Sequence, residues 1–283
     1  MIDHIHCRVQ NDLCFCQNGR RVVGADKYIM NTNNNKDLFF PTNAEVNIIP
    51  VMQGDEQMKV EAADLPDTLP ILALRNAVLF PGMVYPVTIG RQKSITLIKE
   101  AEKRDSFIGA VPQVDITVED PSEKDLYEYG TVSRVMKVLE MPDGTITAII
   151  QGIKRIQMAG VVSYEPYITA RVKYIEDIVP ENDNSTKMIA ESLKEKAAII
   201  IKSSSFAPKE AVGALKSIDN YAFLVNFIAT TIEIENFMEK VQLLGIDDIT
   251  VRAMKLLKVL DTQIQLLKIK QEINQKVKSD IDQ

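Results

Sequence analysis

The feature that most constrains the fold is an apolar stretch broken by prolines, Leu69 to Arg91 (LPILALRNAVLFPGMVYPVTIGR). A membrane-spanning helix needs about 20 apolar residues with few charges, and here two arginines, an asparagine and three prolines interrupt the run. A soluble helix is also disfavoured, because an interior proline removes a hydrogen bond and clashes with the preceding turn. The stretch therefore predicts two short buried strands, residues 71–74 and 84–89. The Pro81-Gly82 turn between them would make a hairpin-like corner.

Residues 66–180 have the pattern of a β-rich region. Apolar and polar residues alternate over residues 168–174, as in a half-buried strand. The segments 132–141 and 145–150 flank Pro142-Asp143-Gly144, which is a hairpin signal. Pro86 should lie near a strand end or on an exposed edge, because it has no N–H for the ladder. Short strands with a single helix predict a small, partly closed barrel. The remaining elements expected here are a strand at 107–111 and a helix at 92–104, with Ile95, Ile98 and Ala101 at helical spacing.

The composition changes near Pro180, where PENDNST indicates a polar linker. Ser185 or Thr186 should cap the helix that follows, whose apolar face is expected at Ile189, Leu193, Ala197 and Ile200. Pro208 suits the first turn of another helix. Two more helices are expected at residues 219–232 and 233–244, the second closed by Gly245.

A long final helix should begin after Asp247 or Asp248, one of which caps it. The chain has no glycine or proline from there to Gln283, so the helix would span roughly 55 Å at 1.5 Å per residue. We expect it to continue beyond Gln283, since no breaker or cap ends it. Its coiled-coil seam is expected at Leu257, Leu260, Ile264 and Leu267, drifting to Ile269, Ile273, Val277 and Ile281.

The bulk composition excludes some classes of protein. Apolar residues make up 46% and charged residues 25%, which suffices for an ordinary soluble core. The net charge of −6 argues against a dedicated nucleic-acid binder, which usually has a basic balance. The N-terminus lacks the apolar segment of a signal peptide. We therefore expect a cytoplasmic protein with no membrane partner.

All five cysteines and histidines lie within the first 16 residues: His4, His6, Cys7, Cys14 and Cys16. Zinc prefers these ligands, but the spacing matches no standard finger, and we expect no metal site. Residues 1–65 show no sustained periodicity and predict a flexible arm. A leader translated upstream of a natural start at Met30 is an alternative.

Sequence signals of catalysis are weak. The segment Gly19 to Asp26 (GRRVVGAD) has P-loop glycine spacing without the lysine and hydroxyl that bind phosphate. No histidine follows position 6, so a Ser-His-Asp triad is not expected. A Ser-Lys pair stays open, but no short motif marks one. We expect no catalytic, cofactor-binding or metal residues on this chain.

Charged clusters have plain structural interpretations. The pairs Glu119-Asp120 and Asp247-Asp248 fit a solvated loop and a helix N-terminus. A small basic patch on the first helix fits a solvated face; its members are Lys99, Lys103 and Arg104.

Three apolar side chains surround the Pro81-Gly82 turn: Phe80, Met83 and Tyr85. Core packing is one interpretation. If they are exposed, they form an apolar patch at the barrel rim, which is typical of a peptide-binding surface, and methionine adapts to varied partners. These three are our candidate substrate-binding residues.

Three blocks of the sequence, in order, resemble the Lon N-terminal region. The first carries L-R, F-P, P and G-R, here Leu74-Arg75, Phe80-Pro81, Pro86 and Gly90-Arg91. The second carries G-T, D-G-T and G-x-x-R, here Gly130-Thr131, Asp143-Gly144-Thr145 and Gly152 with Arg155. The third is the helical segment MEKVQLLGIDDITVRAMKLLKVL. The resemblance covers about residues 66–283, with Ala73 standing where the family usually has proline.

The resemblance implies an α+β fold: a β-rich, PUA-like pseudo-barrel, then a helical bundle and a long C-terminal helix. The implied divisions are a flexible arm or leader (1–65), the Lon N-terminal domain (66–180), the bundle (181–246) and the start of the long helix (247–283). Lon is an ATP-dependent serine protease of the cytoplasm, a homohexamer that degrades misfolded and regulatory proteins. This chain would be its substrate-recognition region. ATP, magnesium and the Ser-Lys dyad would belong to the part that follows.

Two rival functions stay open. A stand-alone Lon-type adaptor would bind peptides without an attached protease. PUA-like folds also bind RNA, which would need a basic groove and strong salt dependence. The residues that could form such a groove are Arg75, Arg91, Arg134, Lys154 and Arg155.

Overall fold

In the computed structural model the chain forms two compact units, Met1–Ile49 and Pro50–Gln283. The structure describes residues 65–141, 145–180, 184–203, 210–232, 234 and 236–281, and before them the backbone of five short strands. These strands are β1 (Arg8–Gln10), β2 (Leu13–Phe15), β3 (Arg21–Val22), β4 (Tyr28–Ile29) and β5 (Phe40–Pro41). The side chains of residues 1–64 lie outside the description. The candidate metal ligands and the P-loop-like segment are among them.

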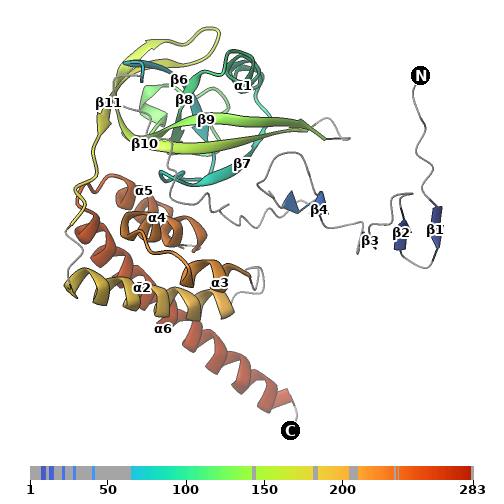
Figure 1. Ribbon diagram of the computed structural model, residues 1–283, viewed down its shortest axis with the longest axis vertical. Helices are drawn as coiled ribbons and strands as arrows, with labels where there is room; N and C mark the ends of the chain where they lie inside the picture. Colours follow the sequence, from blue (N-terminus) through green and yellow to red (C-terminus); the bar gives the residue numbers. More distant parts are fainter. Residues whose placement is uncertain are drawn as a thin grey trace. The chain divides into compact units, whose positions relative to one another are not determined.

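The β-rich part of the second unit is a mixed sheet that closes on itself (Figure 1). The order is β11-β6-β8-β9-β10-β7, and β11 also pairs with β10, so five strands form a ring and β7 lies outside it. The strands are β6 (Thr68–Leu74), β7 (Val84–Ile89), β8 (Phe107–Pro112), β9 (Tyr129–Glu140), β10 (Ile146–Ser163) and β11 (Thr169–Ile175). The expected barrel is thus confirmed.

Helix α1 (Gln92–Arg104) matches its predicted range and connects β7 to β8. It buries Leu97, Ile98 and Ala101, the apolar stripe that a helix lays against a sheet.

The expectation of a hairpin-like corner is wrong. β6 pairs in parallel with β8 and antiparallel with β11, whereas β7 pairs with β10. The Pro81-Gly82 turn instead carries the chain across to β10, where the Gly82 N–H donates to the Gly152 carbonyl at 2.9 Å. β7 ends the strand order, and Pro86 lies on it. This confirms the edge position that a residue without an N–H requires.

Five helices form the second part: α2 (Asn184–Ser203), α3 (Glu210–Lys216), α4 (Tyr221–Thr231), α5 (Phe237–Leu244) and α6 (Ile249–Ile281). α4 is buried along seven consecutive residues, 224–230, so it forms the centre of the bundle, as a helix apolar on all sides must. Among the described residues, no helix is both long and apolar enough to span a bilayer.

The helix ends show which capping predictions hold. Gly245 follows α5 as its C-cap, and Asp248 accepts hydrogen bonds from the N–H groups of Thr250 and Val251 at the start of α6. Both predictions are confirmed. The predicted cap of α2 is wrong, because Ser185 and Thr186 lie inside its first turn. Pro208 and the turn at residues 142–144 lie outside the described residues.

The seam of α6 differs in register from the prediction. Among its described side chains, the fully buried apolar ones are Ile249, Ala253, Leu256 and Leu260, so Leu260 is the one described seam position that is fully buried. Val277 and Ile281 lie outside the described side chains. Beyond the bundle, residues 268–273 are all exposed.

The barrel and the helices share one apolar core. A single cluster of buried side chains joins Phe80, Met83 and Ile150 of the β-rich part to Phe227 and Leu256 of the bundle. A second, smaller cluster lies within the barrel, around Leu69, Val132 and Ile156. The predicted boundary at residue 180 stays a prediction, because packing continues across it.

Candidate functional site

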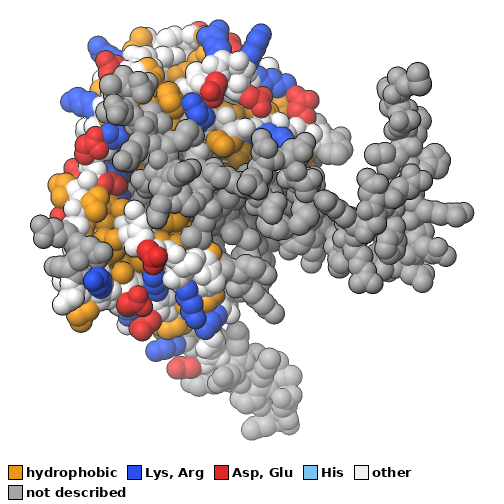
Figure 2. Space-filling model, viewed as in Figure 1, with side chains coloured by type: hydrophobic (Ala, Val, Ile, Leu, Met, Phe, Trp, Pro, Cys, Tyr) orange, Lys and Arg blue, Asp and Glu red, His pale blue; other side chains and the backbone are white. Residues whose placement is uncertain are grey.

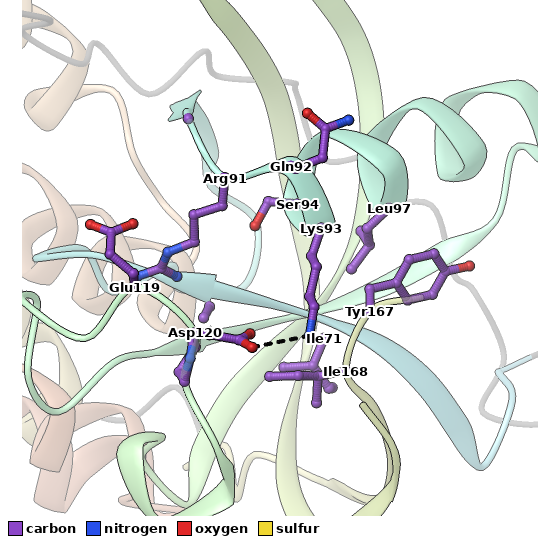
Figure 3. A pocket seen from close by; sticks show the side chains of 13 residues that line it. Ile71, Arg91, Gln92, Lys93, Ser94, Leu97, Glu119, Asp120, Tyr167 and Ile168 are labelled. Atoms are coloured by element: carbon purple, nitrogen blue, oxygen red, sulfur yellow. Dashed lines mark hydrogen bonds and ion pairs between the residues drawn. The ribbon is translucent and has the colours of Figure 1, made fainter. Parts of the chain in front are cut away.

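A cavity of about 350 Å³ lies on the barrel beside α1 (Figure 3). Four segments far apart in the sequence meet there: β6, the start of α1, the loop after β8 and the loop between β10 and β11. The lining residues are Ile71, Ala73, Gly90, Arg91, Gln92, Lys93, Ser94, Leu97, Glu119, Asp120, Pro121, Tyr167 and Ile168.

The floor of this cavity is apolar. Ile71 and Ala73 lie two residues apart on β6 and so share one face of the strand. Leu97 comes from the buried stripe of α1, and Ile168 precedes β11. Tyr167 forms one wall, and its hydroxyl donates to Glu100 at 3.2 Å. Burial and this bond to a carboxylate raise the pKa of Tyr167.

The rim carries ion pairs that join the segments. The ammonium of Lys93 lies 3.1 Å from a carboxylate oxygen of Asp120 and 3.0 Å from one of Glu165. The bonds to Glu165 and Asp120 raise the pKa of Lys93. Figure 3 shows Lys93 reaching over Ile71 and Ile168 toward Asp120. A third pair joins Arg75 to Glu119 at 2.8 Å, so the rim holds cations and anions in balance.

Arg91 is the most constrained side chain of the rim. Its Nη2 donates to the side chain of Gln113 and to the Val118 carbonyl. Its Nε is buried and has no hydrogen-bond partner among the residues that the structure describes. Burial, and then the neighbouring charge of Arg75, lower its pKa, although a guanidinium stays charged at neutral pH. Arg91 thus lines the cavity with a guanidinium that Gln113 and Val118 hold in place, while its Nε is shielded from solvent.

The predicted substrate-binding residues lie elsewhere. Phe80 and Met83 have 0% exposure and belong to the shared core. Tyr85 is partly buried and packs against the same core, and burial raises its pKa. This packing agrees with the core interpretation of the three residues. Their role in substrate binding stays a prediction.

The five basic residues considered for a nucleic-acid groove do not gather into one open patch. Arg134 pairs with Asp105 and lies over the ring of Phe107, Lys154 pairs with Glu176, and Arg155 is buried. The other two, Arg75 and Arg91, belong to the balanced rim. On the face seen in Figure 2, basic and acidic side chains are interspersed over the described part.

A buried charge network, which we call the joint, links the barrel to the bundle. Arg155 of β10 and Arg252 of α6 have 1% and 0% of their side chains exposed, and both donate to the same oxygen of Asp177, at 2.7 and 2.8 Å. Arg155 also reaches Asp247 at 3.0 Å, and Arg252 reaches Asn226 of α4 at 3.0 Å. The joint holds the cavity's barrel in place relative to α6.

A second, more polar cavity of about 610 Å³ lies between β10 and α4, beside the joint. Arg155, Asp177 and Asn226 line it, and their polar groups already hold the two parts of the fold together. The cavity beside α1 is therefore the better candidate for a ligand.

Sequence reasoning missed most of this candidate site. It singled out Arg91 but treated Glu119-Asp120 as a solvated loop, and it did not notice Lys93 or Tyr167. No local signal marks them, because the site exists only where distant segments meet. Among the described residues, no group of three or more His, Cys, Asp or Glu side chains could hold a metal ion. An apolar floor and a balanced rim suit binding rather than bond-making chemistry.

Comparison with known proteins identifies the family. The model of the ATP-dependent protease La (LON) substrate-binding domain matches residues 68–262. The chain is 42% identical to a Lon protease of Flavobacterium johnsoniae over 242 residues, which are 85% of this chain and 30% of that protein. It is 40% identical to a Lon protease of Cytophaga hutchinsonii over 239 residues, 84% of this chain and 29% of that protein. The chain thus spans about 30% of the length of these relatives.

Solved structures support the same fold. The N-terminal domain of a Lon protease from the Mycobacterium avium complex aligns with a TM-score of 0.53 and 17% identity, covering 69% of this chain and 98% of that one. A Lon N-terminal domain protein from Xanthomonas campestris aligns with a TM-score of 0.50 and 18% identity, covering 68% of this chain and 97% of that one. The chain therefore belongs to the Lon protease family and corresponds to its substrate-binding N-terminal region.

Proposed function

We propose that this chain recognises protein substrates for an ATP-dependent serine protease that degrades misfolded and regulatory proteins. The protease would act in the cytoplasm as a homohexamer. The ATPase, its magnesium and the proteolytic residues would lie on other parts of that protein. This proposal rests on membership of the Lon family, whose relatives are about three times as long as the matched region.

The proposed role in substrate recognition rests on the cavity beside α1. It combines an apolar floor with a rim of opposite charges. Unfolded polypeptide exposes apolar side chains next to polar main chain, and such a cavity can meet both. Six copies of a weak site would give tight overall binding through avidity, without sequence specificity.

The test compares one globular protein in two states. A fluorescein-labelled, reduced and carboxymethylated protein, which stays unfolded, is titrated with the full chain, and so is its native disulfide-bonded form. We expect fluorescence anisotropy to rise for the unfolded form and stay flat for the native form. Equal responses, or none, would contradict substrate recognition. Labelled single-stranded RNA is a third probe, and tight, strongly salt-dependent binding would favour the nucleic-acid alternative.

The intact mass of the native protein separates an attached protease from a stand-alone adaptor. A species several times heavier than the 31.8 kDa of this chain, containing its peptides, would support the protease. A native species of about 31.8 kDa would instead support the adaptor.

A further inference from the structure

We propose that Lys93 is the latch of a closed cover over the cavity beside α1, and that breaking its ion pairs opens the cavity down to its apolar floor. The cover consists of the Lys93 side chain and the two loops that it joins, residues 118–122 and 164–166. As a regulation of the recognition site this inference rests on the proposed function, whereas the cover itself is tested without any substrate.

The floor of the cavity is closed to solvent in this structure. Ile71, Leu97 and Ile168 line the cavity, yet their exposed fractions are 3%, 1% and 6%. Figure 3 shows what lies above two of them, because the side chain of Lys93 extends over Ile71 and Ile168. Contact between a ligand and this floor therefore requires that the groups above it move.

Lys93 joins two loops that are distant in the sequence. Its ammonium lies 3.1 Å from a carboxylate oxygen of Asp120, in the loop after β8. It also lies 3.0 Å from an oxygen of Glu165 and donates to the Tyr164 carbonyl at 3.4 Å, both between β10 and β11. Lys93 itself belongs to the first turn of α1, which packs on the barrel through its buried stripe. One side chain thus connects both loops to a fixed helix.

The loop after β8 is fixed at both ends of the part that lines the cavity. At one end the carbonyl of Val118 accepts hydrogen bonds from Gln113 at 2.8 Å and from Arg91 at 2.9 Å. At the other end the N–H and the hydroxyl of Ser122 both donate to Asp125, at 2.9 and 2.7 Å. The residues between these ends can therefore change conformation while the loop stays attached to the barrel.

Exposed ion pairs hold the residues between these ends. Glu119 pairs with Arg75 and Asp120 pairs with Lys93, and the two carboxylate side chains are 78% and 71% exposed. Glu165, on the other loop, is 77% exposed. Exposed ion pairs contribute little net stability and are screened by salt. Loss of the Lys93 pairs should therefore shift the cover toward an open state without unfolding the chain.

The accessibility of an introduced thiol measures this opening. All cysteines of the chain lie within the first 16 residues and are first replaced by serine. Ile71→Cys then places a thiol in the floor, and Ile156→Cys places one in the same apolar cluster, at 0% exposure and outside the cavity lining. The rate of alkylation by iodoacetamide, relative to that of glutathione, reports how often each thiol reaches solvent. Ile168→Cys is a second floor reporter if Ile71→Cys lowers the melting temperature.

Lys93→Met removes the ammonium but keeps an unbranched side chain of similar length. We expect it to raise the alkylation rate of Ile71→Cys about tenfold and to leave that of Ile156→Cys unchanged. Lys99→Met is the matched control, because Lys99 lies on the same helix and forms one exposed pair, with Glu140 at 2.8 Å, outside the cavity lining. It should change neither rate.

Salt should act through the same ion pairs. Raising NaCl from about 0.05 M to about 1 M should speed the alkylation of Ile71→Cys several-fold when Lys93 is present and have little further effect in Lys93→Met. The cover would be overturned if Lys93→Met left the rate at Ile71→Cys unchanged, or if it raised the rate at Ile156→Cys equally.

Binding of the carboxymethylated, unfolded protein separates this inference from the proposed function. If binding requires an open cover, the apparent affinity rises with the open fraction, and Lys93→Met should bind up to about tenfold more tightly. A freed floor thiol without tighter binding would overturn the role of the cover in recognition. If the floor thiol does not respond while the unaltered chain binds unfolded protein, the cover is wrong and the proposed function stands. If the unaltered chain binds no unfolded protein, the proposed function itself fails.

Discussion

At the scale of single residues, the joint depends on one carboxylate. Asp177 faces two guanidinium groups that are almost wholly buried, and one of its oxygens accepts from both. Removing one partner of a buried ion pair leaves an uncompensated charge in a medium that solvates it poorly. Asp177 therefore contributes more to the free energy of unfolding than any of the exposed ion pairs on the cavity rim.

Asp177→Asn tests this, because asparagine keeps the shape and removes the charge. We expect the free energy of unfolding, measured in urea, to fall by about 3–5 kcal/mol. Asp261→Asn is the matched control: it breaks the exposed pair with Lys196 and should cost at most about 1 kcal/mol. Similar losses in the two variants would show that the buried charges of Arg155 and Arg252 do not depend on Asp177.

At the scale of elements, the Pro81-Gly82 turn connects the barrel to α4. Gly82 has a φ of +81°, and a Cβ added there would lie 3.0 Å from the ring of Phe223. The side-chain amide of Asn226 donates to the Pro81 carbonyl at 3.2 Å. The turn thus docks on the bundle, which explains why the side chains flanking it lie in the core.

Gly82→Ala should destabilise the fold for two reasons, backbone strain and a clash with Phe223. Gly160 also has a positive φ, +112°, but open space around its Cβ position. We expect Gly160→Ala to cost only the strain, on the order of 1–2 kcal/mol, and Gly82→Ala to cost about 1–3 kcal/mol more from overpacking. Urea denaturation of both variants, with Phe223→Leu as a partial rescue of Gly82→Ala, measures the difference. A Gly82→Ala chain as stable as Gly160→Ala would mean that the turn does not press on α4.

These elements also show what a sequence can predict. The ranges of β7 and α1 were predicted to the residue, because the local periodicity of apolar residues and the neighbouring prolines and glycines determine them. The parallel pairing of β6 with β8 was not predicted, because pairing depends on partners distant in the chain. Phe80 and Met83 have the same sequence signature whether α4 covers them or solvent does. The cavity was missed for a related reason, since Ile71, Lys93, Asp120 and Tyr167 meet only in the folded chain.

At the scale of the whole molecule, the shared core couples the barrel to the bundle. Phe80 and Phe227 are both fully buried in one cluster, although one comes from the strand-rich part and the other from α4. Neither part buries its apolar surface alone. Two parts that share a core should unfold together.

We therefore expect one cooperative thermal transition, with near-UV and far-UV circular dichroism giving the same midpoint. Phe80→Ala and Phe227→Ala should each cost about 3–5 kcal/mol and move both midpoints equally. If Phe80→Ala lowered only the near-UV midpoint and left a separate helical transition behind, the two parts would be independent.

The placement of Arg252 in the first turn of α6 gives the joint a mechanical consequence. α6 runs from Ile249 to Ile281, a lever roughly 50 Å long at 1.5 Å per residue. Asp177 lies beside the first turn of this helix, where it pairs with Arg252 of α6 and Arg155 of the barrel. A tilt of about 5° at this end would move the far end of the helix through roughly 4 Å, the rise of about three residues. A small rotation of α6 at the joint would thus move the C-terminal end of this helix by several times the displacement at the barrel.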